Sequence, residues 1–421
     1  MNIEFDKLDD EEVLFFIRIK GKKDYFDNYY PTSFLKKFTK LNKFKTISEY
    51  KYDADIIIDI KKYTINDVTI KDYNIIKEVI NIDDVFKRCR GLRAIPYHEA
   101  KELIYRCSKF FIEYYKDNKL KLIVSGTVDN YVMDIMFRFA KYFGVQCLGI
   151  TNFFLYPEYT LVTNYGEHNN FREPTDEEVN HVYHNLKKRK KSQLAISSYK
   201  AHKNAVRYFL SYYYRYIVRY LIQYKVLGKL GYEYRFAPYI KIFHKLNQLF
   251  IRKYFDNIDF EIVKKTPDKY VYMPLHWYPE ATIDYWTDHV DKADYYSYLF
   301  EVITFFKEKN VTVILKEHPA FLYCREISTY EKFKNFDNVI LLNPFISTQY
   351  LSDFVENVVV WNGSTGVESL MLDKKVYVTT ESYYSNHKLP SYKEFGREFN
   401  FSDKDKHDMM RYILRTSLKM S

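Results

Sequence analysis

The segment Val358–Thr379 reads VVVWNGSTGVESLMLDKKVYVT. It opens with the apolar run Val358–Trp361, which indicates a buried strand. Thr365–Leu372 then has the pattern of a helix, and Lys375–Thr379 is again typical of a strand. A strand, a helix and a second strand in this order predict two parallel strands with a helix packed on their sheet.

The rest of the C-terminal part repeats this order of elements. Short loops separate the elements, as a doubly wound parallel sheet requires. The predicted strands are Tyr270–Leu275, Val311–Lys316 and Val339–Leu342, and the predicted helices are Ala293–Glu308 and Ser347–Val355.

The N-terminal part alternates in the same way and predicts a second α/β domain with a parallel sheet. Its predicted strands are Val13–Ile19, Asp55–Ile60, Leu120–Val124 and Val145–Ile150, and its helices are Tyr97–Tyr115 and Asp129–Phe143, the latter stopped by Gly144. We therefore expect one domain over residues 1–174, another over residues 263–421, and a helical connector over residues 175–262.

Length and composition exclude several classes of protein. The 421 residues are 47% hydrophobic, which suits two folded domains and excludes wholesale disorder. The four cysteines form no CxxC pair, which argues against a zinc ribbon and fits a reducing compartment. The sequence shows no signal-peptide pattern and no apolar stretch near the roughly 18 residues that a spanning helix needs. We expect a cytoplasmic location.

The net charge of +10 is concentrated in one segment. Residues 181–256 contain 17 Lys and Arg against two acids, a net of +15, so the remaining chain sums to 10 − 15 = −5. This segment also mixes tyrosines with its cations. Three interpretations compete: a solvated linker helix, a nucleic-acid surface and an anionic membrane surface. No RNA- or DNA-binding motif accompanies the segment, so we favour the membrane surface.

Three loops follow strands at the edge of the C-terminal sheet where ligands bind in open α/β folds. The first contains His276, Trp277 and Glu280; the second reads KEHP at 316–319; the third reads NGSTGVES at 362–369. Lysine and histidine at a strand end suit a phosphate, and the third loop offers backbone N–H groups at a helix start. No Walker A or GxGxxG motif is present, so P-loop kinases and dinucleotide oxidoreductases are disfavoured.

These motifs carry a family resemblance. PLHWYPEAT at 274–282, KEHP at 316–319 and GSTGVES at 363–369 resemble bacterial capsule and surface-polysaccharide glycosyltransferases related to the Kdo and nonulosonate transferases. The His-Pro and Ser/Thr elements are also similar to those of bacterial sialyltransferases. The resemblance implies a GT-B fold with two Rossmann-like domains, an N-terminal domain for the acceptor and a C-terminal domain for the nucleotide-sugar.

The resemblance also implies roles for individual residues. His318, Ser364 and Thr365 would bind the donor phosphate, with Lys316 supporting that charge and His276 nearby in the first loop. Glu368 would contact the ribose and Glu280 would face the sugar. The predicted donor site is thus His276, Lys316, His318, Ser364, Thr365 and Glu368, and the predicted catalytic residues are Asp129, Glu280 and His318.

Asp129 has two interpretations. It follows the strand Leu120–Val124, where its carboxylate could act as a base or nucleophile, but it could equally be the N-cap of the following helix. Glu158, Glu167 and His168 are weaker acidic or basic candidates in a polar loop.

No metal site is expected. Asp53-Ala54-Asp55 matches a DxD pattern but precedes its strand, which favours an acidic strand entry. His181 and His184 could pair on a helix, but neither cysteines nor acids accompany them as further zinc ligands.

The expected function is transfer of a sugar, favouring a CMP-activated ulosonic or nonulosonic acid, to a growing bacterial capsule or surface glycan. A CDP-polyol phosphotransferase and a non-catalytic capsule assembly or export factor are the alternatives. Expected partners are the nucleotide-sugar, a glycan or glycolipid acceptor and the inner-membrane surface, without nucleic acid and without a cofactor. The residues expected to face the membrane are Lys187, Lys188, Arg189, Lys190 and Lys191.

Overall fold

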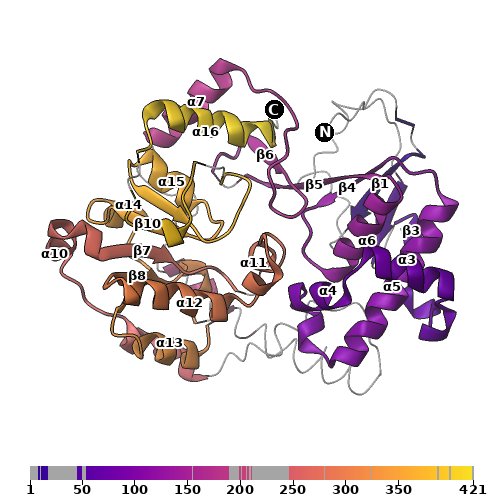
Figure 1. Cartoon of the computed structure of the whole chain (residues 1–421), viewed down its shortest axis with the longest axis horizontal. Helices are drawn as coiled ribbons and strands as arrows, with labels where there is room; N and C mark the ends of the chain where they lie inside the picture. The colour runs from indigo at the N-terminus through magenta and orange to yellow at the C-terminus, as the bar shows by residue number, and fades with distance from the viewer. Residues whose placement is uncertain are drawn as a thin grey trace.

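The structure is a computed structural model that describes residues 8–9, 11–17, 45–49, 54–153, 155–188, 199–200, 202–204, 206–207, 210, 246–278, 280–323, 325–385, 388–397 and 400–419. Within them the chain forms two sheets, one in each half of the molecule (Figure 1). Much of the predicted connector, including Arg189, Lys190 and Lys191, lies outside the described residues.

The C-terminal sheet has the strand order β11-β10-β7-β8-β9, and every neighbouring pair is parallel. Its strands are buried runs of Val, Ile, Leu and Tyr because helices cover the sheet. The strands are β7 (Tyr270–Pro274), β8 (Thr312–Lys316), β9 (Val339–Leu342), β10 (Asn357–Val360) and β11 (Lys375–Val378). The helices are α10 (Phe260–Lys265), α11 (Ala281–Asp284), α12 (Tyr295–Glu308), α13 (Ile327–Lys334), α14 (Thr348–Ser352) and α15 (Thr365–Met371).

The N-terminal sheet has the order β12-β6-β5-β4-β1-β2-β3 and is parallel except where β6 pairs with β5 and β12. Its strands are β1 (Val13–Ile17), β2 (Lys45–Ser48), β3 (Ile56–Ile57), β4 (Leu122–Gly126), β5 (Gln146–Asn152), β6 (Tyr159–Val162) and β12 (Ser417–Lys419). Its helices are α3 (Ile70–Val79), α4 (Ile82–Arg88), α5 (Tyr97–Asp117) and α6 (Tyr131–Tyr142). Gly144 follows α6 with φ of 76°, which confirms it as the helix stop.

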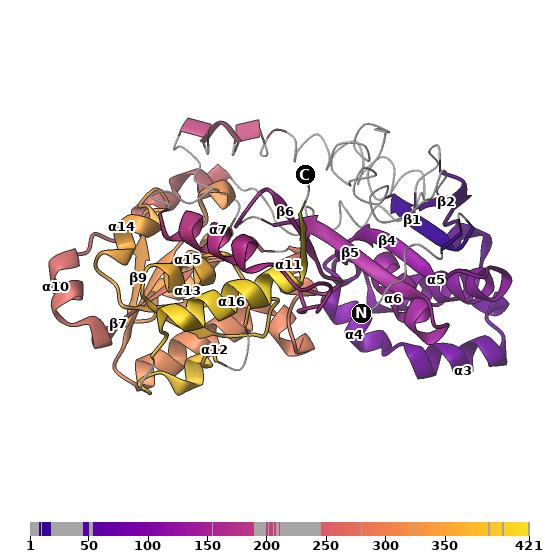
Figure 2. The ribbon, with the colours of Figure 1, turned by 90° about the horizontal axis from the view of Figure 1, so that it is seen from above.

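The C-terminus returns to the N-terminal domain. Helix α16 (Asp403–Arg415) packs beside α7 (Asp176–Lys187), and the two lie side by side in Figures 1 and 2. The strand β12 that follows α16 then pairs with β6 of the N-terminal sheet. The sequence predicts that all of residues 263–421 belong to the C-terminal domain. Strand β12 instead belongs to the N-terminal sheet. The two sheets with their helices confirm the two α/β domains predicted from the sequence.

Helix α7 begins with a capping box. Thr175 caps it, with its side chain accepting from the Glu178 N–H while the Glu178 carboxylate accepts from the Thr175 N–H. The helix packs on α16 and α15, so this start of the predicted connector lies against the C-terminal half. Among the described residues, no helix combines the length and apolar character needed to cross a bilayer.

The two domains meet through buried charges. Asp284, at the end of α11, has no exposed side-chain surface and forms ion pairs with Arg90 and Arg93 of the N-terminal domain, at 2.8 and 2.7 Å. Arg88 adds a hydrogen bond to the Thr287 carbonyl at 3.2 Å. Since a buried carboxylate is costly without partners, these arginines bind the domains to each other at α11.

Trp286 is a second contact between the domains. Its indole N–H donates to the Thr127 hydroxyl at 3.0 Å, and its ring lies directly on the backbone of Gly166. Gly166 has φ of 82°, and a Cβ built there would lie 2.4 Å from the Trp286 ring. Glycine is therefore required both by the backbone conformation and by the close approach of the indole.

Gly166→Ala should lower the free energy of unfolding by the left-handed strain of about 1–2 kcal/mol and by an overpacking cost of about 1–3 kcal/mol. Gly144→Ala is the matched control, because Gly144 also has positive φ but nothing lies within 4 Å of its added Cβ. Urea denaturation of both variants separates the two costs. Equal losses would contradict the close packing of Trp286 on Gly166.

Candidate active site

Three loops lie at the carboxyl ends of the adjacent strands β10, β7 and β8. Because these strands are parallel, their ends meet at one edge of the sheet, as predicted for a ligand site. The ring of His276, after β7, lies against Gly363, after β10, where an added Cβ would be 3.1 Å from it. Trp277 and His318 bring the first and second loops together, with ring centroids 6.3 Å apart.

A buried ion pair that the sequence analysis missed supports the second loop. Glu317 and Arg325 are almost completely buried and pair through two contacts of 2.6 and 3.0 Å. Glu317 also accepts from the Tyr330 hydroxyl and from the His318 N–H, at 2.8 and 2.9 Å. Each of its oxygens therefore has two donors, and the backbone before Pro319 is held in place.

Arg325 also reaches the first loop. Its guanidinium donates to the His276 carbonyl at 2.9 Å and to the Tyr296 hydroxyl at 2.8 Å. The only local sequence signal for this pair is an acidic residue inside KEHP, since Arg325 lies eight residues further on with nothing to mark it. One arginine thus fixes the relative positions of two predicted donor loops.

The site keeps its histidines neutral. Burial lowers the pKa of His276 to about 3, and its proximity to His318 and Arg325 acts in the same direction. Burial also lowers the pKa of His318, with Lys316 and Arg325 acting in the same direction and Glu317 opposing them. At neutral pH both imidazoles can therefore accept one hydrogen bond and donate another.

Lys316 is the basic group of the site. Lys316 is 7% exposed, and its side-chain ammonium forms no hydrogen bond or ion pair with the described part of the chain. Burial lowers the pKa of Lys316 to about 8, against the opposing attraction of the Glu317 and Glu368 carboxylates. A buried ammonium in this state is suited to an anionic ligand.

The third loop contributes Ser364, Thr365 and Glu368, all half-buried. Ser364 is the N-cap residue of α15 but makes no side-chain capping bond. Gly363 and Gly366 both pack closely, Gly363 on His276 and Gly366 on Tyr384. The structure thus brings His276, Lys316, His318 and the third loop together, while their roles toward a donor stay predictions.

The predicted catalytic carboxylates lie near the domain contact. Glu280 is half-buried and accepts from the Thr282 hydroxyl at 2.8 Å. Burial raises the pKa of the Glu280 carboxyl, with Asp284 acting in the same direction and the Thr282 hydroxyl and Arg90 opposing. A raised pKa is typical of a carboxyl group that exchanges a proton during catalysis.

Asp129 is 5% exposed and forms an ion pair with Arg90, which also binds Asp284. It is not the N-cap of α6: that residue is Asn130, whose side chain accepts from the Met133 N–H at 2.9 Å. The alternative interpretation of Asp129 as a helix cap is therefore wrong, because the helix starts one residue later.

The weaker candidates have structural partners. Glu167 accepts from the backbone N–H groups of Asn164 and Tyr165, and His168 stacks on Tyr412 with ring centroids 3.6 Å apart. Glu158 is exposed.

The residues that match metal-binding patterns contact other residues of the protein. Asp55 accepts from the N–H and hydroxyl of Thr46, both at 2.8 Å, while Asp53 lies outside the described residues. His181 bonds Tyr156, and His184 lies edge-on to Tyr183. In the part of the chain that the structure describes, no group of three His, Cys, Asp or Glu could hold a metal ion.

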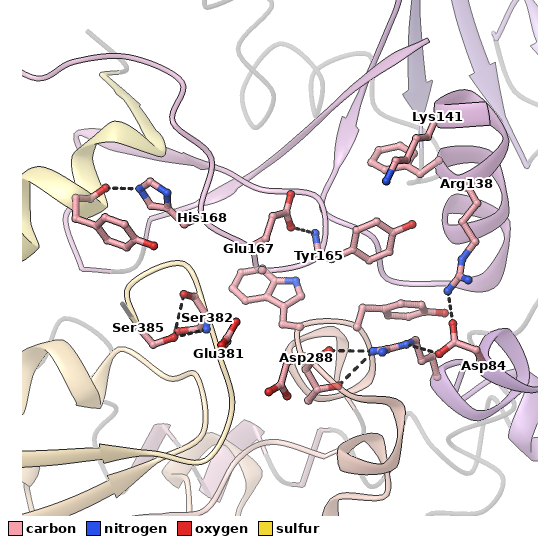
Figure 3. Close-up of a pocket in the computed structure, with 17 residues that line it drawn as sticks. Asp84, Arg138, Lys141, Tyr165, Glu167, His168, Asp288, Glu381, Ser382 and Ser385 are labelled. Atoms are coloured by element: carbon pink, nitrogen blue, oxygen red, sulfur yellow. Dashed lines mark hydrogen bonds and ion pairs between the residues drawn. The ribbon is translucent and has the colours of Figure 1, made fainter. Parts of the chain in front are cut away.

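A separate cavity of about 630 Å³ lies at the junction of the two domains (Figure 3). None of the predicted donor residues lines it, whereas the weaker candidates Glu167 and His168 do. Trp286 lines it from the C-terminal domain, and Arg138 and Lys141 line it from α6.

Comparison with known proteins supports a family relationship. The family model described as "Capsule polysaccharide biosynthesis protein" matches residues 134–412. A comparison with curated proteins finds no match.

Solved structures with a related arrangement have low sequence identity. Thermosulfurimonas dismutans KpsC, described as a beta Kdo 2,7 transferase, is similar at 12% identity and TM-score 0.34 over 73% of this chain and 79% of that chain. KpsC described as a beta Kdo 2,4 transferase is similar at 10% identity and TM-score 0.35 over 72% and 85%. UDP-GlcNAc 2-epimerase from Methanocaldococcus jannaschii is similar at 12% identity and TM-score 0.27 over 96% and 99%. TM-scores this low do not establish that these proteins share the fold of this chain.

Arg325→Met should lower the free energy of unfolding by about 3–5 kcal/mol, because it leaves the Glu317 carboxylate buried without a counter-charge. The double variant Glu317→Gln, Arg325→Met removes both charges and should recover a large part of that loss. A double-mutant cycle by urea denaturation measures the coupling. A double variant as unstable as Arg325→Met alone would contradict the pairing.

Proposed function

The chain belongs to the capsule polysaccharide biosynthesis protein family, and on this basis we propose that it is a glycosyltransferase. It transfers a sugar from a nucleotide donor, CMP-linked by preference, to a growing bacterial capsule or surface glycan. The donor binds at the three loops of the C-terminal domain, and the acceptor approaches from the N-terminal domain.

The observation that carries this proposal is the buried ammonium of Lys316. A buried ammonium without an ion pair among the described residues is unfavourable, and its lowered pKa expresses that cost. A donor phosphate beside Lys316 supplies the missing counter-charge and restores the pKa toward its ordinary value. The neutral imidazoles of His276 and His318 add uncharged donors and acceptors for the same group.

In the transfer step, the bond between the anomeric carbon and the phosphate oxygen of the donor breaks. The bonding electrons leave with the phosphate, whose developing charge Lys316 and His318 stabilise. The acceptor oxygen bonds to the anomeric carbon and loses its proton to a carboxylate. Glu280 suits this base better than Asp129, because the Glu280 pKa is raised while Asp129 is paired with Arg90.

A panel of CMP, CDP, UDP, GDP and ADP tests the nucleotide by thermal shift. CMP at 100 times its dissociation constant should stabilise the protein by about 2.7 kcal/mol, which raises the melting temperature by several degrees. A rise with UDP and none with CMP or CDP would contradict the CMP assignment. A rise with CDP alone would favour the polyol phosphotransferase.

The shift with CMP should depend on the protonation of Lys316. The ammonium is present below a pKa of about 8, so CMP affinity should fall on the order of tenfold as pH rises from 7 to 9.5. His318 is neutral throughout this window and does not contribute. Lys316→Met should bind CMP weakly at both pH values.

Normal glycan output in cells that carry His318→Ala would instead favour a non-catalytic assembly factor.

We also propose that the basic segment docks the enzyme on the inner face of the membrane, supported by its net charge of +15 over residues 181–256. Lys187 serves a different purpose, since it pairs with Asp403 of α16 at 3.2 Å, whereas Lys188 is exposed. Replacing Lys188, Arg189, Lys190 and Lys191 with Gln should reduce co-sedimentation with phosphatidylserine vesicles at low salt. Unchanged co-sedimentation would remove the membrane proposal.

A further inference from the structure

The cavity at the domain junction has the size of a ligand site and a lining that the transfer step does not use. Its volume of about 630 Å³ lies within the roughly 300–1,000 Å³ of small-molecule pockets. We propose that this cavity binds a saccharide segment of the acceptor glycan, away from the donor loops. This inference rests on the proposed function, because that function supplies a glycan chain long enough to reach a second site.

Aromatic side chains from both domains form much of the lining. Phe137 and Tyr165 come from the N-terminal domain, Tyr285 and Trp286 come from the C-terminal domain, and Tyr412 comes from α16. Trp286 is held firmly, because its N–H bonds Thr127 and its ring rests on Gly166. Rigid aromatic surfaces combined with polar groups suit the C–H faces and hydroxyls of a sugar.

Most charges that line the cavity are already compensated. Arg88 and Arg138 both pair with Asp84 (Figure 3). Arg138 also pairs with the buried Asp134. Asp288 pairs with Lys292 at 2.8 Å. A phosphate or polyanion would therefore meet no cluster of unpaired cations here, which favours a saccharide over a second nucleotide.

Two exposed side chains keep their charges available. Lys141 lies on the N-terminal side of the cavity, and Glu381 lies on the loop after β11. Among the described residues, the side chain of neither has an ion pair or hydrogen bond. One acceptor carboxylate and one ammonium donor on opposite walls can bind sugar hydroxyls from two sides.

Ser382 supplies a buried polar group. It is 5% exposed, and its hydroxyl has no well-formed hydrogen bond among the described residues. The Tyr384 hydroxyl, its polar neighbour, donates instead to the Gly363 carbonyl at 3.0 Å. A buried hydroxyl whose one polar contact, with the Tyr384 hydroxyl, is poorly formed lowers stability, so the Ser382 hydroxyl is available to a bound polar molecule.

The cavity is also placed where an acceptor chain would pass. Trp286 lies two residues after Asp284, whose ion pairs with Arg90 and Arg93 define the domain contact. Arg90 in turn binds Asp129, a residue of the predicted catalytic set. A glycan that entered along the domain junction would therefore contact the cavity on its way to the reacting centre.

The three tryptophans of the chain report on three different places. Trp277 belongs to the donor loops, Trp286 lines the cavity, and Trp361 is completely buried. In a Trp277→Phe variant, emission comes from Trp286 and Trp361 only. Short oligosaccharides released by mild acid from the cell's own capsule should change this emission saturably, and Trp286→Phe in the same background should abolish the change.

Two further variants show whether a loss of oligosaccharide binding comes from the cavity or from a loss of folding. Glu381→Gln should weaken oligosaccharide binding on the order of tenfold, whereas Glu308→Gln, an exposed control on α12, should not. Ser382→Ala should weaken binding several-fold without lowering the melting temperature, a result that a purely structural serine would not give. Absence of a saturable change in the Trp277→Phe variant, or unchanged affinity in Glu381→Gln, would overturn the cavity proposal.

The same assay separates this inference from the proposed function. CMP titrated into Trp286→Phe is read by Trp277 at the donor loops. If CMP changes that signal and the oligosaccharide leaves Trp286 unaffected, the cavity proposal fails and the transferase proposal stands. If the oligosaccharide changes Trp286 emission and no nucleotide shifts Trp277 or the melting temperature, the cavity proposal is supported and the donor assignment fails.

Discussion

Asp284 imposes the constraint on which the arrangement of the molecule depends. Its side chain has no exposed surface, so its charge is tolerated only because Arg90 and Arg93 of the other domain pair with it. The pairing fixes α11 against the N-terminal domain and places Arg90 beside Asp129. It also sets Trp286, two residues later, against Gly166 at the cavity. The positions of Asp129 and of the cavity both follow from these ion pairs.

The C-terminal domain also depends on a buried ion pair, which lies at the loops proposed to bind the donor. Glu317 and Arg325 lie within the fold, satisfy each other and hold the backbone of two loops. Burial near this pair keeps His276 and His318 neutral. Lys316 differs from the other buried charges, because its pKa falls to about 8 although Glu317 and Glu368 attract it. The Glu317–Arg325 pair is thus the scaffold of the site, and the ammonium of Lys316, which has no ion pair among the described residues, is the group proposed to bind the donor phosphate.

The parallel core was the most predictable part of the fold. Strands buried on both faces are continuous apolar runs, so β7, β8, β9, β10 and β11 were predicted to within about one residue at each end. Strands β2, β6 and β12 were missed: each is short, and β6 and β12 pair antiparallel across distant parts of the chain. The three loops proposed to bind the donor were located from the sequence because they follow predicted strands. Arg325 was missed because its partner is set by packing and not by spacing.

The sequence by itself determined the α/β class, the two sheets, the loops that meet at one sheet edge and the family to which their motifs belong. These features depend on local periodicity and on the rule that parallel strands end together. The tertiary structure alone decided which charges are buried, because burial depends on residues far apart in the chain. It paired Asp284 with two arginines of the other domain, lowered the pKa of Lys316, joined the C-terminal strand to the N-terminal sheet and enclosed the aromatic cavity.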